Sequence, residues 1–490
     1  MKNIIEAMNP VPRPEKVLQF GEGNFLRAFV DWQIDILNDK TDFNGNAALV
    51  QPLELGMGDT INAQQGLYTT LLRGVQKGKT IEECRLIKSV SRCLNPYSHF
   101  DEYLRCAENP DLRFVISNTT EAGIAYNAED RLFDRPQRSF PGKVTAFLFR
   151  RFEHFRGDPA RALVFIPCEL IDQNGGKLKE IVERYAGEWN LGAPFLAWLD
   201  SCDFCNSLVD RIVPGYPGDA AAICEKIGYE DKLLVAAEIF HLWVIESKKD
   251  HSAELPLVQA GLNVIWTGDM SFYRTRKVRI LNGAHTSSVL AAYLYGLDTV
   301  EQCIHDPLII KMMKRGIFDE IIPSMEGDEA ELIQYAQDVL ERFANPYIKH
   351  LLLSIALNSV SKFKTRVLPS LIGYITKKGK LPPVLVFSLA ALIAFYEGGD
   401  LSGRELRGSR NGTAYSIQDD EDVLKRFAAL YAETGGDEAA RAEKITRAVL
   451  GSADWWGEDL REYAGLEAAV SAYLGAIRKS GVKAVIEGLV

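Results

Sequence analysis

The segment KVRILNGAHTSS, residues 277–288, places a lysine, an asparagine and a histidine within nine positions. On an α-helix with ~100° per residue, Lys277, His285 and Asn282 point to about 0°, 80° and 140°. The three side chains therefore share one broad face and can converge on one point. A set of this kind could move a proton at a hydroxyl group or at a carbonyl oxygen.

Hydride removal from a secondary alcohol requires a base for the hydroxyl proton and hydrogen-bond donors for the developing oxyanion. A lysine held as the neutral amine could be that base, which assigns the role to Lys277, with Asn282 and His285 as the donors. In the reverse direction the charged lysine would protonate the carbonyl oxygen. The plainer interpretation is a partly exposed helix start with a surface lysine, a helix-start asparagine and a core histidine. The spacing alone leaves both interpretations open.

A glycine turn near the chain start could hold the hydride carrier. The apolar run EKVLQF ends at Phe20, breaks at Gly21 and Gly23, and turns to helical periodicity. Two glycines of a dinucleotide fingerprint allow a tight turn and a close approach of backbone N–H groups to a pyrophosphate. Leu26 replaces the third glycine, which predicts a wider gap between helix and strand. The residues predicted to bind the cofactor here are Phe20, Gly21, Glu22, Gly23, Asn24, Phe25, Leu26 and Arg27.

A later segment, SNTTEAG, follows another apolar run and offers Thr119 and Thr120 for cofactor contacts. The alternative is that one of these threonines caps the start of a helix. The acid that binds the ribose is expected ~20 residues beyond the turn, where this chain has Gln51 and Pro52, with Glu54 just beyond. No arginine stands there either, which favours NAD over NADP.

The elements that must position these residues change along the chain. Apolar runs at 15–20, 47–52, 114–120 and 162–168 are separated by segments long enough for helices, which predicts a doubly wound parallel sheet. Beyond about residue 255, helix formers dominate the runs at 278–294, 330–343, 348–360, 381–396, 423–433 and 439–449. We therefore expect an α/β fold, with a Rossmann-like NAD-binding domain over residues 1–265 and a mostly α-helical substrate domain over residues 266–490.

The composition and charge of the chain limit the kinds of partner that it is expected to bind. A net charge of −10 with no basic run argues against nucleic acid and favours a small-molecule partner. Scattered cysteines and the absence of a signal-peptide pattern at the start favour a reducing cytoplasm. The pair Cys202 and Cys205 lacks a second ligand pair nearby, so no metal site is predicted. The apolar run 381–396 is shorter than the ~20 residues that cross a bilayer, which predicts a buried helix and no membrane partner. Residue patterns do not define the oligomeric state.

The chain resembles the polyol-specific long-chain dehydrogenases, typified by mannitol dehydrogenase. Their K-x4-N-x2-H motif is matched by Lys277, Asn282 and His285. Other similar segments occur in the same order over nearly the whole chain: FGEGNFLRAF, QQGLYTTLLR, TTEAG, NSLVDRIVP, WVIE, RFANPYI and SKFKTRVLP. The resemblance implies that Lys277 is the acid/base, that Asn282 and His285 form the oxyanion site, and that Asp210 and Lys362 line the substrate pocket.

Two departures from the polyol pattern concern the substrate. Ser354 stands eight residues before Lys362, where the polyol enzymes carry an arginine, and Leu170 replaces the asparagine of their CDN segment. Both changes affect contacts to sugar hydroxyls, so mannitol is not the expected substrate. The segments 20–38 and 345–369 are most similar to the hexuronate-reducing branch of the family. This similarity implies NADH-dependent reduction of a keto group in an acid sugar.

A carboxylate substrate needs a cation, and Lys362, Lys364 and Arg366 cluster in one segment. The alternative for Lys364 and Arg366 is the solvated end of a helix or strand.

Three other functions stay open: a reductase of a different hexuronate or of a neutral polyol, a dinucleotide-binding protein without catalysis, and a partner-binding scaffold. The intact lysine, asparagine and histidine set argues against loss of catalysis, and NADH binding would exclude the scaffold.

Overall fold

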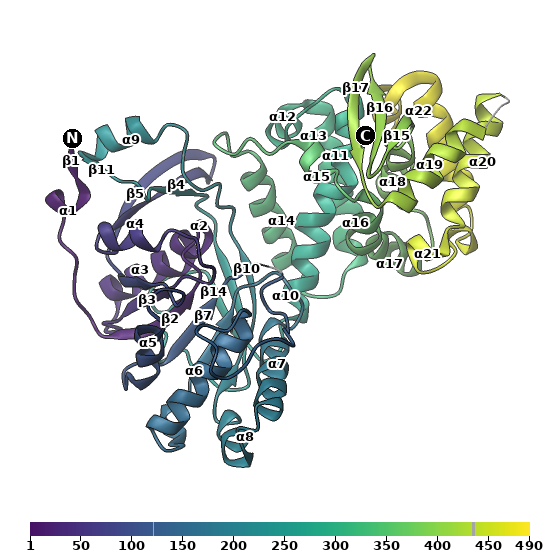
Figure 1. The fold of residues 1–490 in the computed structure, drawn as a ribbon. Coiled ribbons are helices and arrows are strands. Elements are labelled where there is room, and N and C mark those ends of the chain that lie inside the picture. The colour runs from purple at the N-terminus through teal and green to yellow at the C-terminus, as the bar shows by residue number, and fades with distance from the viewer. Residues whose placement is uncertain (121, 434–436) are drawn as a thin grey trace. The chain divides into compact units, whose positions relative to one another are not determined.

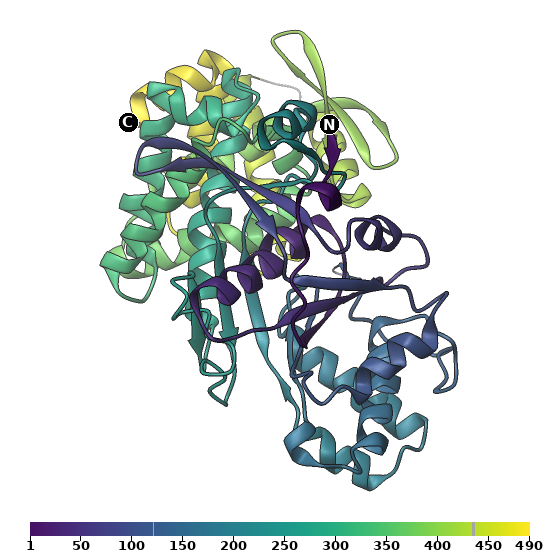
Figure 2. The ribbon, with the colours of Figure 1, turned by 90° about the vertical axis from the view of Figure 1, so that its left-hand side faces the viewer.

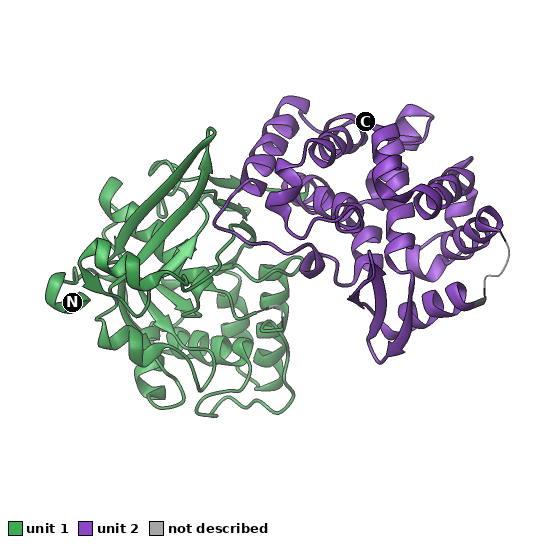
Figure 3. Ribbon diagram, turned by 90° about the horizontal axis from the view of Figure 1, so that it is seen from above, with its two compact units in different colours: residues 1–271 green, residues 272–490 purple. Residues whose placement is uncertain are grey.

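The computed structural model describes residues 1–120, 122–433 and 437–490 (Figure 1). The chain forms two compact units, Met1–Ser271 and Phe272–Val490 (Figure 3). The first is built on a parallel sheet and the second mainly of helices, so the predicted fold class is confirmed. Within the described ranges, no helix combines the length and the apolar character needed to cross a membrane.

A six-stranded sheet in the order β6-β3-β2-β7-β8-β9 forms the centre of the first unit. All its neighbouring strands are parallel. The four apolar runs predicted as strands form β2, β3, β7 and β8, which confirms those predictions. Because β3 and β7 flank β2 on opposite sides, the strand order reverses at β2, where doubly wound folds bind their ligands. The strands are β2 (Glu15–Phe20), β3 (Asn46–Val50), β6 (Val90–Leu94), β7 (Phe114–Ser117), β8 (Val164–Pro167) and β9 (Asp203–Phe204).

Alternating side chains of this sheet fill two separate cores. Val17 and Ile116 belong to the core on one face, which is covered by a continuous helical run and a second sheet. That run is α2 (Asn24–Leu26), the π-helical η1 (Arg27–Asp31) and α3 (Trp32–Lys40), and that sheet is β10 (Asn206–Asp210), β13 (Leu242–Glu246) and β14 (Val264–Thr267). Leu18 and Val115 belong to the core on the other face. Its helices are α5 (Phe100–Arg105), α6 (Phe140–His154), α7 (Asn174–Glu188) and α8 (Ala193–Leu199).

The remaining strands of the first unit lie outside the central sheet. β4 (Tyr68–Gln76) and β5 (Lys79–Ile87) form a long antiparallel hairpin, seen in Figure 2, and β12 (Val235–Ala237) pairs with β4. β1 (Lys2–Asn3) pairs with β11 (Tyr229–Glu230). The other helical elements are α1 (Ile4–Ala7), α4 (Gly58–Ala63), η2 (Cys106–Glu108), η3 (Pro159–Arg161) and α9 (Ala220–Ile227).

The second unit packs its helices around α18 (Pro383–Phe395), which contacts α11 (Gly283–Tyr295) and α22 (Leu466–Leu489). Nearly every side chain of α18 is buried, so the prediction of a buried helix is confirmed. The surrounding elements are α10 (Ser271–Arg276), η4 (Lys277–Asn282), α12 (Val300–His305), α13 (Pro307–Lys314), η5 (Arg315–Ile321), η6 (Ile322–Ser324), α14 (Glu329–Phe343), α15 (Leu352–Ile355), α16 (Ser359–Arg366), α17 (Leu368–Lys378), α19 (Glu421–Glu433), α20 (Glu438–Leu450), α21 (Ala453–Trp456) and η7 (Leu460–Glu462).

Two parts of the second unit differ from the sequence-based expectation. Residues 398–418 form an antiparallel sheet of β15 (Gly398–Ser402), β16 (Glu405–Arg410) and β17 (Thr413–Gln418). These strands are largely exposed and polar, so no apolar run announces them. The helix predicted over 348–360 is wrong, because residues 348–358 form a loop with one short helix, α15, and α16 begins only at Ser359. Asn358, with φ 52° in the left-handed region, interrupts the helical path before α16.

Candidate active site

The glycine turn lies at the carboxyl end of β2, where the strand order reverses. Gly21 has φ 118°, and a Cβ there would lie 3.0 Å from the carbonyl oxygen of Asn118. The turn therefore requires glycine at this position. Gly23 has an extended backbone and precedes the helical run 24–40, and a Cβ added to it would meet no described atom within 4 Å. The open space over Gly23 at a helix start suits a pyrophosphate.

The apolar side chains of the predicted cofactor segment point into the protein. Phe20 is fully buried, with its ring 4.9 Å from that of Phe140. Leu26 is buried as well, and the Phe25 ring stacks on Phe29 at 5.0 Å. These side chains fix the turn against both cores. Contact with a cofactor at these positions is therefore left mainly to the backbone.

The polar side chains of the same segment tie it to its surroundings. The buried Arg27 guanidinium donates to the carbonyl oxygens of Glu22 and Leu233 and to Oδ1 of Asn24. Glu22 Oε1 accepts from the N–H of Met57 at 3.3 Å. Burial, the largest contribution, raises the pKa of Glu22. Arg27 thus serves the chain's own carbonyls, while Glu22 joins the turn to the loop after β3.

That loop begins with Gln51, at the position where a ribose-binding acid was expected. The buried Gln51 amide donates to the carbonyl oxygens of Leu53 and Glu54 and accepts from the N–H of Gly58. Gln51 is therefore occupied in shaping the loop. The sequence 51–58 contains neither lysine nor arginine.

Thr119 and Thr120 follow β7, the strand beside β2. The N–H and the hydroxyl of Thr119 both donate to Oε1 of the buried Glu169, at 2.9 Å each. Thr120 has φ 79°, a strained value for a β-branched residue. The alternative that either threonine caps a helix is wrong, because the next helix, α6, begins at Phe140 with Ser139 as its cap. Glu121 of this segment lies outside the described residues.

The K-x4-N-x2-H motif lies inside a continuous helical run rather than at its start. The run begins with α10, and Lys277 and Asn282 are the first and last residues of the π-helical η4. The angular estimates for an α-helix therefore do not apply between these two residues, since a π-turn is wider. Such π-helical segments occur frequently at functional sites. Lys277 and Asn282 are both partly exposed, whereas His285 is buried in α11.

His285 is held in a neutral state by its surroundings. Its ring lies 4.0 Å from the Phe343 ring and 5.4 Å from that of His350. Burial, followed by the charges of His350, Arg342 and Arg366, lowers the pKa of His285 well below its ordinary value. Nδ1 is buried and has no hydrogen-bond partner in the part of the chain that the structure describes. A neutral imidazole with one unsatisfied nitrogen is suited to contact a substrate oxygen.

The three cations of α16 separate onto two sides of that helix. Lys362 and Arg366 stand four residues apart and so share one face. The Arg366 carbonyl lies against Gly283 of α11, while Lys364 lies beside Gly457 after α21. Lys362 Nζ donates to the carbonyl oxygen of Ile355 at 2.8 Å.

Arg366 is a partly buried cation with no counter-ion among the described residues. Across residues 1–120, 122–433 and 437–490, no side chain or carbonyl is hydrogen-bonded or ion-paired to its guanidinium. Burial lowers the pKa of Arg366. Burial and then the charge of Arg366 lower the pKa of Lys362. The side of α16 that faces α11 therefore carries the Arg366 charge, which no described acidic side chain pairs, and the Lys362 charge, which Asp419 offsets in part.

Sequence reasoning missed His350, which lies near both His285 and this charge. Burial and then the charge of Lys362 lower the pKa of His350. His350 lies in an irregular loop, and its neighbours in space come from distant parts of the chain, so no local spacing in the sequence identifies it. Ser354, the position of the missing arginine, lies in α15 directly before Ile355. Asp210 is buried at the end of β10, and Leu170 is exposed in the segment after β8; both belong to the first unit.

Two family models together match most of the chain: the mannitol dehydrogenase Rossmann domain over residues 15–259, and the mannitol dehydrogenase C-terminal domain over residues 269–478. The chain belongs to the mannitol dehydrogenase family. The resemblance drawn from its motifs is thereby confirmed. Curated relatives in this family include the altronate oxidoreductases of Cronobacter sakazakii, 48% identical, and of Escherichia coli, 47% identical, each over 97% of both chains.

Two solved structures share the fold of this chain. The ternary complex of Pseudomonas fluorescens mannitol 2-dehydrogenase with NAD and D-mannitol is 21% identical, with a TM-score of 0.66, over 99% of this chain and 96% of that one. D-Sorbitol dehydrogenase in its substrate-free form is 22% identical, with a TM-score of 0.75, over 97% and 95%.

In this mannitol dehydrogenase family member, Gly23→Val is expected to weaken NADH binding about tenfold or more. The extended backbone and the open space at Gly23 accommodate valine, but its side chain would fill the volume that we assign to the pyrophosphate. A fluorescence titration measures the NADH dissociation constant, and an unchanged thermal unfolding temperature serves as the control. An unchanged dissociation constant would exclude the turn as the cofactor site.

Proposed function

We propose that this protein is a tagaturonate reductase, which uses NADH to reduce the keto group of D-tagaturonate and forms D-altronate reversibly. Its identity of 47–48% to altronate oxidoreductases over 97% of the chain supports this function. The observation that carries the acid-sugar assignment is the Arg366 guanidinium near His285, which no described acidic side chain pairs. A bound carboxylate would neutralise that charge.

The N-terminal domain, residues 1–265, binds the cofactor in this proposal. The backbone of residues 20–27 holds the pyrophosphate, and Thr119 and Thr120 line the neighbouring strand end. Nothing basic stands at residues 51–58 to pair with a 2′-phosphate, which favours NAD over NADP. When bound, NADH supplies the hydride.

The C-terminal domain, residues 266–490, handles the proton and the substrate. Lys277 gives a proton to the carbonyl oxygen as the alcohol forms, and takes it back in altronate oxidation. Asn282 and the neutral His285 donate hydrogen bonds to that oxygen as its negative charge develops. Proton transfer needs no metal ion in this scheme. Asp210 is assigned to the substrate's hydroxyl groups.

Lys362 and Arg366 are assigned to the substrate carboxylate. Arg366 presents a planar fork of donors that matches a carboxylate, and no ion pair competes for it in the described structure. Lys362 is restrained by the Ile355 carbonyl and adds a second positive charge. Ser354, which is exposed in α15, stands where the polyol enzymes carry an arginine. The reaction is assigned to the cytoplasm, with no nucleic acid or membrane as a partner.

A substrate panel tests the proposal. NADH oxidation is followed by absorbance with D-tagaturonate, D-fructuronate and D-fructose, and NADPH replaces NADH in a parallel series. We expect the highest kcat/KM for tagaturonate with NADH. A higher value for fructuronate would identify a fructuronate reductase, and a higher value for fructose a neutral polyol dehydrogenase. Absence of turnover despite NADH binding would identify a non-catalytic binding protein.

A further inference from the structure

A second group of chemically versatile side chains lies in the first unit, around the edge strand β9. Asp203, Cys205 and His251 each offer one donor atom, a carboxylate oxygen, Sγ and a ring nitrogen, and these atoms lie within 4.8 Å of one another. Cys205 and His251 are buried, whereas Asp203 keeps partial exposure. Three donors of different type are thus gathered from β9, the residue after it, and the loop after β13.

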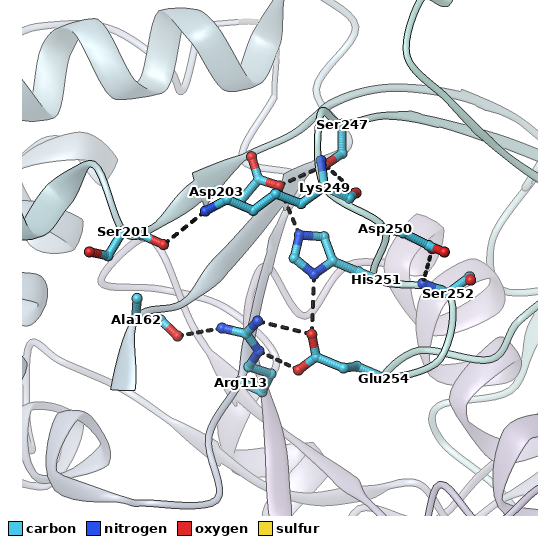
Figure 4. Close-up of polar contacts among 10 residues, drawn as sticks. All are labelled: Arg113, Ala162, Ser201, Asp203, Ser247, Lys249, Asp250, His251, Ser252 and Glu254. Carbon is cyan, nitrogen blue, oxygen red and sulfur yellow. Dashed lines mark hydrogen bonds and ion pairs between the residues drawn. The ribbon is translucent and has the colours of Figure 1, made fainter. Parts of the chain in front are cut away.

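Hydrogen bonds around His251 resemble the outer shell of a metal site. His251 Nδ1 lies 3.2 Å from Oε1 of Glu254, and both Glu254 oxygens accept from the Arg113 guanidinium at 2.6 and 2.9 Å (Figure 4). His251 Nε2 points the other way, 2.8 Å from Oδ2 of Asp203. A metal-bound histidine commonly donates its second ring N–H to a carboxylate, which fixes the ring orientation. Glu254 is placed for that role.

The position of the cluster separates it from the cofactor turn. Asp203 pairs with Val164, the first residue of β8, whereas the last residue, Pro167, pairs with Ser117 next to the predicted cofactor contacts. The cluster therefore lies toward the amino ends of the parallel strands. The glycine turn lies at their carboxyl ends. Ligation here would join the loop 247–254 to the edge of the sheet.

We propose that Asp203, Cys205 and His251 bind a zinc ion, with a water molecule as the fourth ligand. Thiolate and imidazole donors select zinc over magnesium or calcium, which prefer oxygen ligands alone. The partial exposure of Asp203 leaves access for the water. The ion stabilises the first unit and takes no part in hydride transfer.

Zinc binding at this site must release protons. A thiol binds zinc as the thiolate, so Cys205 gives up its proton when it becomes a ligand. The proton between His251 and Asp203 leaves as well when Nε2 becomes a ligand. Both protons go to the solvent, which makes zinc affinity increase with pH.

The full-length protein is freed of metal with a chelator, incubated with ZnCl₂ and passed through a metal-free column. We expect about one zinc ion per chain by mass spectrometry. A hundredfold excess of zinc over its dissociation constant should raise the unfolding temperature by about 5 °C. Cobalt in place of zinc should give the near-ultraviolet charge-transfer band of a thiolate ligand.

Cys205→Ser and His251→Gln are expected to lose the bound ion, and Cys205→Ser the charge-transfer band. Cys202→Ser is the matched control, because Cys202 is also buried, three residues away, but is not part of the donor set. The proposal is overturned if the unaltered protein retains no zinc, shows no thiolate band with cobalt, or if both variants keep the metal. His251 would then only pair with two carboxylates. Should the variants fail to fold, metal content and the cobalt spectrum of the unaltered protein still decide.

Discussion

Replacement of Lys277 by alanine is expected to lower kcat for tagaturonate reduction by about 10²- to 10⁴-fold, the range typical of an acid/base residue. NADH should bind with an unchanged dissociation constant, since Lys277 lies in the second unit and the cofactor turn in the first. Stopped-flow absorbance and a binding titration measure these quantities.

Lys364→Ala provides the matched control. It removes another partly exposed lysine of the same unit, on the side of α16 away from α11, and should leave kcat near that of the unaltered enzyme. Near-normal turnover of Lys277→Ala would remove Lys277 from the chemical step. Asn282→Ala should lower kcat by about 10²-fold or more, as expected for the loss of one oxyanion donor.

The second large effect concerns substrate charge. Tagaturonate is expected to exceed tagatose, its neutral counterpart, in kcat/KM by about 10³-fold or more, because a neutral ligand leaves desolvated cations unpaired. Arg366→Met and Lys362→Met should each reduce this preference, mainly by lowering kcat/KM for tagaturonate. Steady-state kinetics on both substrates give the ratio for each variant.

Lys364→Met is the control for this series, since the third cation of the segment points away from α11. It should keep the full preference for the acid substrate. The assignment of the carboxylate site fails if tagatose is reduced as efficiently as tagaturonate. It also fails if Arg366→Met and Lys362→Met weaken both substrates alike, because those cations would then not act on charge.

The parts of the fold that depend on local patterns could be predicted from the sequence. Apolar runs gave β2 and β3, glycines gave the turn after β2, and continuous hydrophobicity gave α18. The sheet of β15, β16 and β17 was missed, because its strands are short, polar and mostly exposed. His350 was missed for a related reason. Its neighbours in space come from α11 and α16, and an irregular loop brings it to them.

The candidate site shows the same division between local and distant information. The K-x4-N-x2-H spacing identified Lys277, Asn282 and His285, but the π-helical turn that carries the first two has no signature in the sequence. The sequence grouped Lys364 with Arg366, and only helix packing separates them. Cys205 and His251 are likewise 46 residues apart in the chain, and only the fold brings them together.

Deuterium transfer tests the central claim most directly. The protein is incubated with tagaturonate and NADH that carries deuterium at the transferred position of the nicotinamide, and the product is examined by NMR and mass spectrometry. We predict D-altronate with one deuterium on the carbon that was the keto group, in equal amount to the NAD formed. Altronate without deuterium, or no altronate while NADH remains bound, would contradict direct hydride transfer to tagaturonate.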